Sequence, residues 1–123
     1  MIINCLAVGA GGALGSIFRY LLLCLFPVAS ISFPLATMGI NIAGAFCVGL
    51  VIGATDKITS FDPRLLLFLK VGLCGGFTTF SAFSFESLEL LQNGKTIAAA
   101  TYMVVSVILC ISSVACAQAI GKL

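Results

Sequence analysis

Charged residues, histidine and tryptophan are what this sequence has least of. Only 8% of its 123 residues are charged and 61% are hydrophobic, so a water-soluble domain would lack the polar side chains to cover its surface. The absence of histidine excludes His-based catalysis, and the absence of tryptophan excludes Trp belts at a membrane interface. A net charge of +2 is too small for a nucleic-acid-binding surface. The composition predicts an integral membrane protein that is not an enzyme and does not bind nucleic acid.

Cysteine is present, but not in a pattern that indicates a redox or metal centre. No two cysteines form a C-x-x-C pair, and no histidine is available to complete a zinc site. All of them fall in apolar runs, so we expect small buried hydrophobic side chains, with a redox or metal role as the less favoured alternative. Disulfide bonds are not expected at such depths. The six cysteines stand at positions 5, 24, 47, 74, 110 and 116.

Four apolar stretches are long enough to cross a bilayer, which takes about 20 residues. They lie near 2–25, 34–55, 65–91 and 96–120. The first lacks a basic start and continues beyond the apolar core of a signal peptide, so we expect it to be retained as a span. The sequence predicts an all-α, multi-pass protein of a bacterial inner or plasma membrane, surrounded by lipid, with one transmembrane domain over residues 1–123.

Polar or turn-forming residues separate the four spans. A short loop from Pro27 to Pro34 follows the first span, and the polar stretch 56–64 follows the second. Residues 92–95 (Gln-Asn-Gly-Lys) form a tight helix stop before the fourth. If loops alternate between the two sides of the membrane, four basic residues lie on one side and two on the other. The four are Lys57, Arg64, Lys70 and Lys122, and the two are Arg19 and Lys95. This weak bias is compatible with insertion in both orientations.

Small residues recur four positions apart in all four spans, a spacing that lets helices approach closely. We interpret most of these pairs as ordinary packing. Four helices still enclose little interior, so we expect a second copy of the chain to be needed to build a pathway. The pairs are Gly11/Gly15, Gly49/Gly53, Gly72/Gly76 and Ala115/Ala119.

Residues 75–86, Gly-Gly-Phe-Thr-Thr-Phe-Ser-Ala-Phe-Ser-Phe-Glu, are poorly suited to a lipid-facing helix. Two adjacent glycines weaken a helix, and two β-branched threonines follow them. The third span is also long for a straight crossing, and a break around Gly75–Thr79 would absorb the excess. Such a break frees backbone carbonyls, which must be buried in protein or line a cavity. The alternative is a glycine-rich packing seam filled by aromatic side chains.

Three motifs in this order resemble the Fluc family of fluoride channels, also called CrcB proteins. The resemblance covers most of the chain, and the three motifs together are far more specific than the third alone. They are Gly11-Gly12-Ala13-x-Gly15-x-x-x-Arg19-Tyr20, Asn41-x-x-Gly44-Ala45-Phe46 and Gly75-Gly76-x-Thr78-Thr79-Phe80-Ser81-x-Phe83-Ser84.

The resemblance implies an antiparallel, dual-topology homodimer in which the breaks of the two third spans meet. It implies that Phe80 and Phe83 line the fluoride pore, with Asn41 as a polar group of the pore. It also implies a structural sodium ion at the dimer centre that is not transported, held by the backbone carbonyls of Gly75 and Thr78. An aromatic ring edge is electropositive and attracts an anion weakly, as conduction through several weak sites requires.

Neutral hydrogen-bond donors are what the spans offer to a small anion. Asn41 and Thr37 lie one turn apart, and Tyr102 and Ser106 are likewise four residues apart. Ser81 flanks the phenylalanines. A single hydroxyl is usually bonded to its own helix, but the group of Thr37, Ser81, Tyr102 and Ser106 is a candidate pore lining together with Asn41.

Two charged residues have undecided roles. Arg19, the only charge in the first span, is a candidate for attracting anions into a vestibule, or an anchor at the interface. Glu86 is either near a pore mouth or at a solvated helix end. No carboxylate is expected at mid-membrane, and proton-coupled carriers usually need one.

The sequence therefore predicts a passive, fluoride-selective channel that lowers cytoplasmic fluoride, with fluoride itself implied by the resemblance. Two alternatives stay open, namely a coupled small-anion transporter and a structural subunit of a larger membrane complex. Fluoride flux through the isolated chain distinguishes the three.

Overall fold

The computed structural model describes residues 1–25, 33–58 and 60–123. The loop expected from Pro27 to Pro34 lies mostly outside the described residues, as does Thr59. Four helical segments are long and apolar enough to cross a membrane, which confirms the all-α fold with four spans. Their bounds are Ile2–Leu25, Leu35–Lys57, Pro63–Gln92 and Thr96–Gly121.

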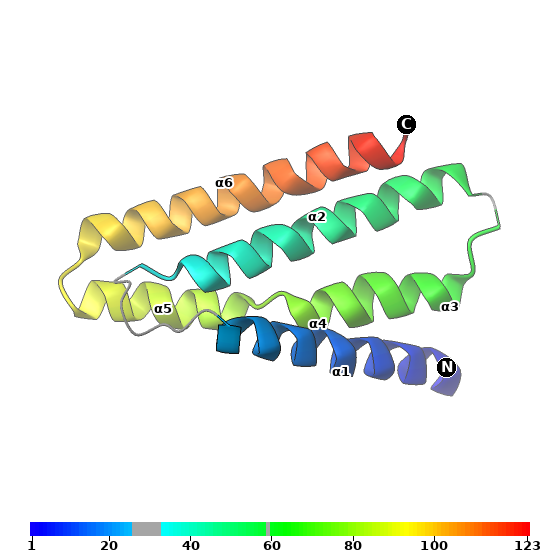
Figure 1. Ribbon diagram of the computed structural model, residues 1–123, viewed down its shortest axis with the longest axis horizontal. Helices are drawn as coiled ribbons and strands as arrows, with labels where there is room; N and C mark the ends of the chain where they lie inside the picture. Colours follow the sequence, from blue (N-terminus) through cyan, green and yellow to red (C-terminus); the bar gives the residue numbers. More distant parts are fainter. Residues whose placement is uncertain (26–32, 59) are drawn as a thin grey trace.

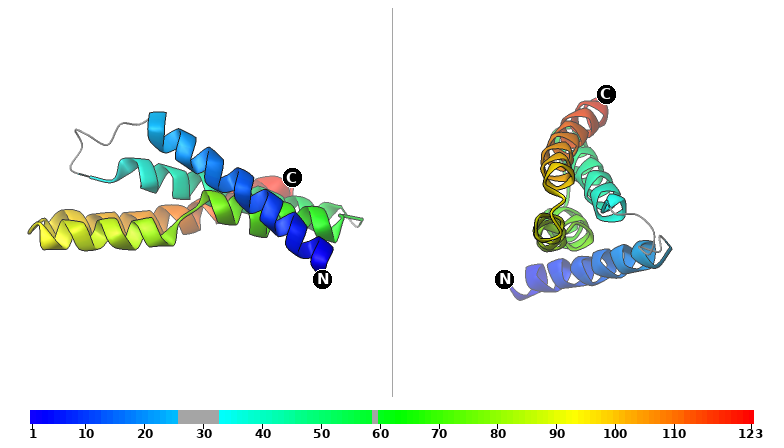
Figure 2. Two further views of the ribbon diagram at one scale, coloured as in Figure 1. Left: turned by 90° about the horizontal axis from the view of Figure 1, so that it is seen from below. Right: turned by 90° about the vertical axis from the view of Figure 1, so that its left-hand side faces the viewer.

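The spans lie side by side in an order that differs from the chain order. Helix α2 (Leu35–Lys57) lies between α6 (Thr96–Gly121) and the third span, and α1 (Ile2–Leu25) crosses the other side of the third span (Figures 1 and 2). Both termini and the turn after α2 lie at one end of the molecule, and the turn before α6 lies at the other (Figure 1). The third span is therefore in contact with all three other spans.

The third span is built from several short pieces instead of one regular helix. It comprises α3 (Pro63–Leu66), the π-helical η2 (Leu67–Cys74), α4 (Gly75–Phe77) and α5 (Phe80–Gln92). Asp62 caps its start, where the carboxylate accepts the Arg64 N–H at 2.7 Å. Its end follows the expected stop, because Gly94 has a φ of +73° and α6 begins at Thr96.

The interruption lies at Thr78–Thr79, next to the two glycines and not at them. Gly75 keeps helical dihedrals, φ −65° and ψ −36°, whereas Thr78 has ψ 157° and Thr79 has φ −148°. The glycine at 76 instead permits close approach of α1, because a Cβ there would lie 2.6 Å from the Gly12 carbonyl oxygen. A break near Gly75–Thr79 is confirmed, but the glycines serve packing and the threonines carry the change of direction.

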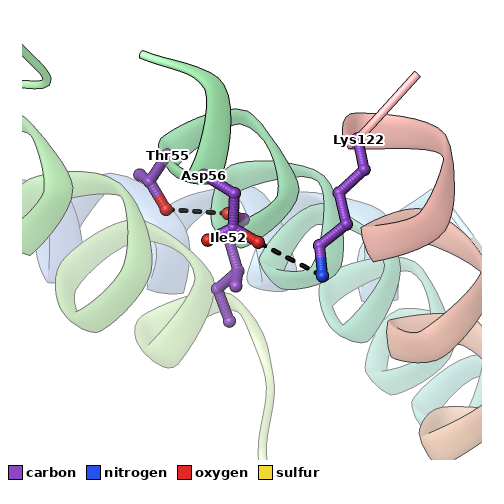
Figure 3. Close-up of polar contacts among 4 residues, drawn as sticks. All are labelled: Ile52, Thr55, Asp56 and Lys122. Carbon is purple, nitrogen blue, oxygen red and sulfur yellow. Dashed lines mark hydrogen bonds and ion pairs between the residues drawn. The ribbon is translucent and has the colours of Figure 1, made fainter. Parts of the chain in front are cut away.

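Glycine also lets α2 approach α6. A Cβ on Gly53 would lie 2.7 Å from the Gln118 carbonyl oxygen, and Ala117 is fully buried at this seam. Ala115 and Ala119 are exposed, so this pair does not pack against another helix of the same chain. Lys122 Nζ lies 3.3 Å from Asp56 Oδ2 at the end of the seam, beside the bond from the Thr55 hydroxyl to the Ile52 carbonyl (Figure 3).

Candidate functional site: the interrupted third span

Asn41 of α2 binds the interrupted backbone at two points. Its Nδ2 donates to the Thr79 carbonyl at 3.1 Å, and its Oδ1 accepts the Thr79 N–H at 2.8 Å. The amide oxygen thus replaces the helical acceptor that the Thr79 N–H has lost, the Gly75 carbonyl. The amide nitrogen adds a donor to the Thr79 carbonyl, which as the carbonyl of the N-cap residue also accepts the first bond of α5. Asn41 was expected to be a polar group of a pore, and the structure places this amide on the backbone of the break.

Thr79 restarts the helix on the far side of the break. Its hydroxyl accepts the Ala82 N–H at 3.2 Å, which is the bond of an N-cap residue. The same hydroxyl lies 3.1 Å from that of Ser81, which is exposed. Ser84 bonds back to the Phe80 carbonyl at 2.9 Å, so its hydroxyl is used within its own helix.

The carbonyls of Gly75 and Thr78 lack the donors that a continuous α-helix would give them. The N–H four residues after Gly75 is that of Thr79, which binds Asn41. The N–H four residues after Thr78 is that of Ala82, which binds the Thr79 hydroxyl. Carbonyl oxygens in this state suit a hard cation. Within the described ranges, no group of three or more His, Cys, Asp or Glu side chains is placed to hold a metal ion.

Three aromatic rings lie close together after the break, two on α5 and one on α6. The ring centroids of Phe80 and Phe83 are 5.3 Å apart, and those of Phe83 and Tyr102 are 5.2 Å apart. Phe80 is 77% exposed, whereas Tyr102 is fully buried with Leu90 and Ala99. The rings form a short row from the surface of α5 into its contact with α6.

Glu86 joins three helices through both of its carboxylate oxygens. The Thr37 hydroxyl of α2 donates to Oε1 at 2.6 Å, and the Tyr102 hydroxyl of α6 donates to Oε2 at 2.7 Å. Thr37 and Tyr102 are both buried. The two hydroxyls that were expected to face an anion therefore donate to a carboxylate in this arrangement.

Ser106 lies one turn after Tyr102 on α6, and its hydroxyl is unsatisfied. The residue is 4% exposed. Across the described part of the chain, Ser106 Oγ is the buried side-chain polar atom for which no hydrogen-bond partner is found. Buried hydroxyls are normally bonded, so this atom has capacity for a ligand.

A groove of about 980 Å³ opens beside the Glu86 network, between α1, α2 and α5. Its lining is mostly apolar, with Thr37, Glu86, Glu89, Asn93 and Lys95 as polar residues. Arg19 is half-buried on α1, and no carboxylate within residues 1–25, 33–58 and 60–123 lies within ion-pair distance of it. The structure does not bring Arg19 into direct contact with the Phe80–Glu86 region.

Comparison with known proteins shows the family of this chain. The sequence profile described as "CrcB-like protein, Camphor Resistance (CrcB)" matches residues 6–118. The chain belongs to the CrcB-like family. It is 42% identical over 106 residues to a protein of Chlorobium luteolum named "Fluoride-specific ion channel FluC", an alignment that covers 86% of this chain and 82% of that protein. A protein of the same name from Ruminiclostridium cellulolyticum is 39% identical over 121 residues, which is 98% of this chain and 93% of the relative.

Membership of the CrcB-like family confirms the resemblance drawn from the three motifs, the membrane location and the absence of enzymatic activity. Within this CrcB-like chain, the sequence left the roles of Arg19 and Glu86 undecided, and the structure places Glu86 between the Thr37 and Tyr102 hydroxyls. The available signal was its position three residues after Phe83, which puts both on one face of α5. The bond from Asn41 to Thr79 had no comparable signal.

Proposed function

We propose that this chain forms a fluoride-selective channel that lets fluoride leave the cytoplasm down its electrochemical gradient. The observation that carries the proposal is the near full-length similarity to relatives named fluoride-specific ion channels. It is supported by an interrupted third span with aromatic rings and hydroxyl groups beside it. The ion would move passively, because both oxygens of Glu86, the carboxylate nearest the rings, already accept hydroxyl groups, whereas coupled carriers usually exchange protons on a carboxylate within the membrane.

The proposed path for fluoride runs along the rings of Phe80 and Phe83 to the hydroxyl of Ser106. Ring edges offer weak attraction, and the unpaired Ser106 hydroxyl offers a hydrogen bond that costs no existing contact. Thr37 and Tyr102 contribute through Glu86, since their protons already point to its carboxylate. Ser81 and Asn41 line the same region, and Asn41 keeps its second amide hydrogen for an ion.

A structural sodium ion is proposed at the Gly75 and Thr78 carbonyls. The residues fit this ion because their usual donors are engaged elsewhere. One chain supplies only two of these carbonyl oxygens, too few to surround a hard cation. A second copy related by an antiparallel axis would double the set, so the sodium proposal also favours a homodimer. Removal of sodium should then weaken the dimer, and a dimer indifferent to sodium would refute the site.

Dual topology is proposed because the two ends of the molecule differ little in basic residues. Lys57, Arg64 and Lys122 lie toward the end with both termini, and Lys95 lies toward the other. Arg19, in the last turns of α1, would raise the concentration of anions near the second end. This weak bias lets two copies insert in opposite orientations.

The decisive experiment measures fluoride efflux from liposomes that hold only this protein. A potassium gradient with valinomycin supplies the charge balance for electrogenic movement. We expect fluoride to leave and chloride to stay inside. Trapped fluoride would exclude the channel and favour a structural subunit, whereas efflux that requires a proton or sodium gradient would favour a coupled transporter.

A further inference from the structure

Two of the cysteines share one small cavity beside the break. Cys47 of α2 and Cys74, the last residue of η2, both line a cavity of about 360 Å³ whose other walls are apolar side chains. Cys74 is 4% exposed and Cys47 is exposed. Within the described chain, both cysteines are free thiols.

The register of the two helices brings these residues to the same level. A Cβ on Gly44 would touch the Thr78 side chain, so α2 is in direct contact with the third span at its interruption. The two helices run antiparallel (Figure 1). Cys47 lies three residues after Gly44, and Cys74 lies four residues before Thr78. At 1.5 Å per residue, both lie about 5 Å from that contact in the same direction.

We propose that Cys47 and Cys74 form a dithiol site for a soft, two-coordinate cation such as Cu⁺ or Hg²⁺. Sulfur ligands select soft metals, and binding needs no redox partner. Two S–H bonds release their protons to water, and two sulfur–metal bonds form. Zinc is disfavoured because it takes four ligands, and the described residues offer no His, Asp or Glu to complete a set with these thiols.

A metal bridge at this site would join α2 to the residue that supports the break. The Cys74 carbonyl accepts both the N–H and the hydroxyl of Thr78, each at 3.0 Å. Asn41 on α2 binds Thr79. A cation held between Cys47 and Cys74 therefore restrains both supports of the interrupted backbone. We expect it to slow fluoride efflux, a consequence that rests on the proposed function, whereas metal binding does not.

The test uses the purified full-length protein, HgCl₂ as the probe and an excess of a monothiol as competitor. A two-sulfur chelate resists the monothiol, whereas mercury on a single cysteine is removed. Intact mass spectrometry should find a one-to-one mercury adduct in the wild type and in the control variant Cys116→Ala, whose thiol is exposed on α6. Cys47→Ala and Cys74→Ser should lose the adduct. Retention in Cys47→Ala, or loss in the wild type, would overturn the site.

A second arm measures efflux from liposomes with and without HgCl₂. We expect mercury to slow efflux about tenfold or more in the wild type and in Cys116→Ala but not in Cys47→Ala. Mercury retained without slower efflux would overturn the proposed restraint and leave the dithiol site standing. A wild type that retains mercury yet moves no fluoride even before mercury is added would instead refute the proposed function.

Discussion

The parts of the molecule before and after Thr78–Thr79 are held by different kinds of contact. Before the break, glycine lets backbone touch backbone, as where Gly76 meets Gly12 and Gly72 meets Val8. After the break, α5 is held by side chains, through the bonds of Glu86 and the ring contacts of Phe83. Backbone contacts have no alternative rotamers, whereas side chains do. The first part therefore fixes where the chain is interrupted, and the second presents groups that can move to follow an ion.

The close backbone contact between α1 and the third span should not tolerate an added side-chain atom. Gly15→Ala places a Cβ against the backbone, with the Phe77 nitrogen 2.8 Å away. Alanine otherwise favours a helix over glycine by about 1 kcal/mol, so any loss of stability must come from this contact. We expect little monodisperse protein by size-exclusion chromatography. Gly9→Ala on the same helix is the control, because its Cβ would meet nothing within 4 Å. Equal yields of the two variants would show that the protein does not need this close contact between α1 and the third span.

Substitutions in α5, the part held by side chains, should reduce conduction without unfolding the protein. Phe80→Ile and Phe83→Ile remove the ring edges that would attract fluoride, and we expect efflux to fall about tenfold or more. The size-exclusion profile should stay that of the wild type. Phe85→Ile is the matched control, because Phe85 is 68% exposed on the same helix but is not part of the ring row. If Phe85→Ile slows efflux as much as the other two, the rings are not specific to the path.

Asn41 connects the two halves, so its replacement should affect both stability and conduction. Asn41→Leu keeps the number and branching of the side-chain heavy atoms but leaves the buried Thr79 N–H unpaired, at a cost of about 1–3 kcal/mol. We expect a lower melting temperature and efflux reduced several-fold. Asn41→Asp keeps the acceptor for the Thr79 N–H, so its melting temperature should fall between those of Asn41→Leu and the wild type. Full efflux in Asn41→Leu would mean that the break holds its shape without this amide.

The sequence alone was sufficient for features that depend on neighbours along the chain. The spans follow from runs of apolar residues, and the stop at Gln92–Lys95 follows from turn-forming residues. The vicinity of the break followed from Gly75, Gly76 and the two threonines. The sequence did not indicate which of these four residues carries the change of direction, because helix propensity disfavours glycine as well as the β-branched threonines.

Contacts between distant residues could not be predicted from one sequence. Asn41 and Thr79 are 38 positions apart, and Thr37 and Glu86 are 49 apart. Their pairing depends on how α2 is placed against its neighbours, where Gly44 closely approaches Thr78 and the glycines at 49 and 53 closely approach α6. The π-helical turn of η2 depends likewise on packing against α1. The residue pattern of a single helix shows neither how α2 packs on its neighbours nor where η2 contacts α1.

The smallest predicted effect concerns two buried hydroxyls, that of Ser106, which is proposed to bind the ion, and that of Ser87, which stabilises its own helix. Ser106→Ala removes a buried hydroxyl that has no partner, so the melting temperature should stay the same or rise, while efflux falls a few-fold. Ser87→Ala is the control, because Ser87 is equally buried on α5 but donates to the Phe83 carbonyl at 2.7 Å. It should lose about 1 kcal/mol of stability and conduct as the wild type does. If both variants lose stability and neither loses efflux, Ser106 belongs to the packing and the proposed path must run along other groups.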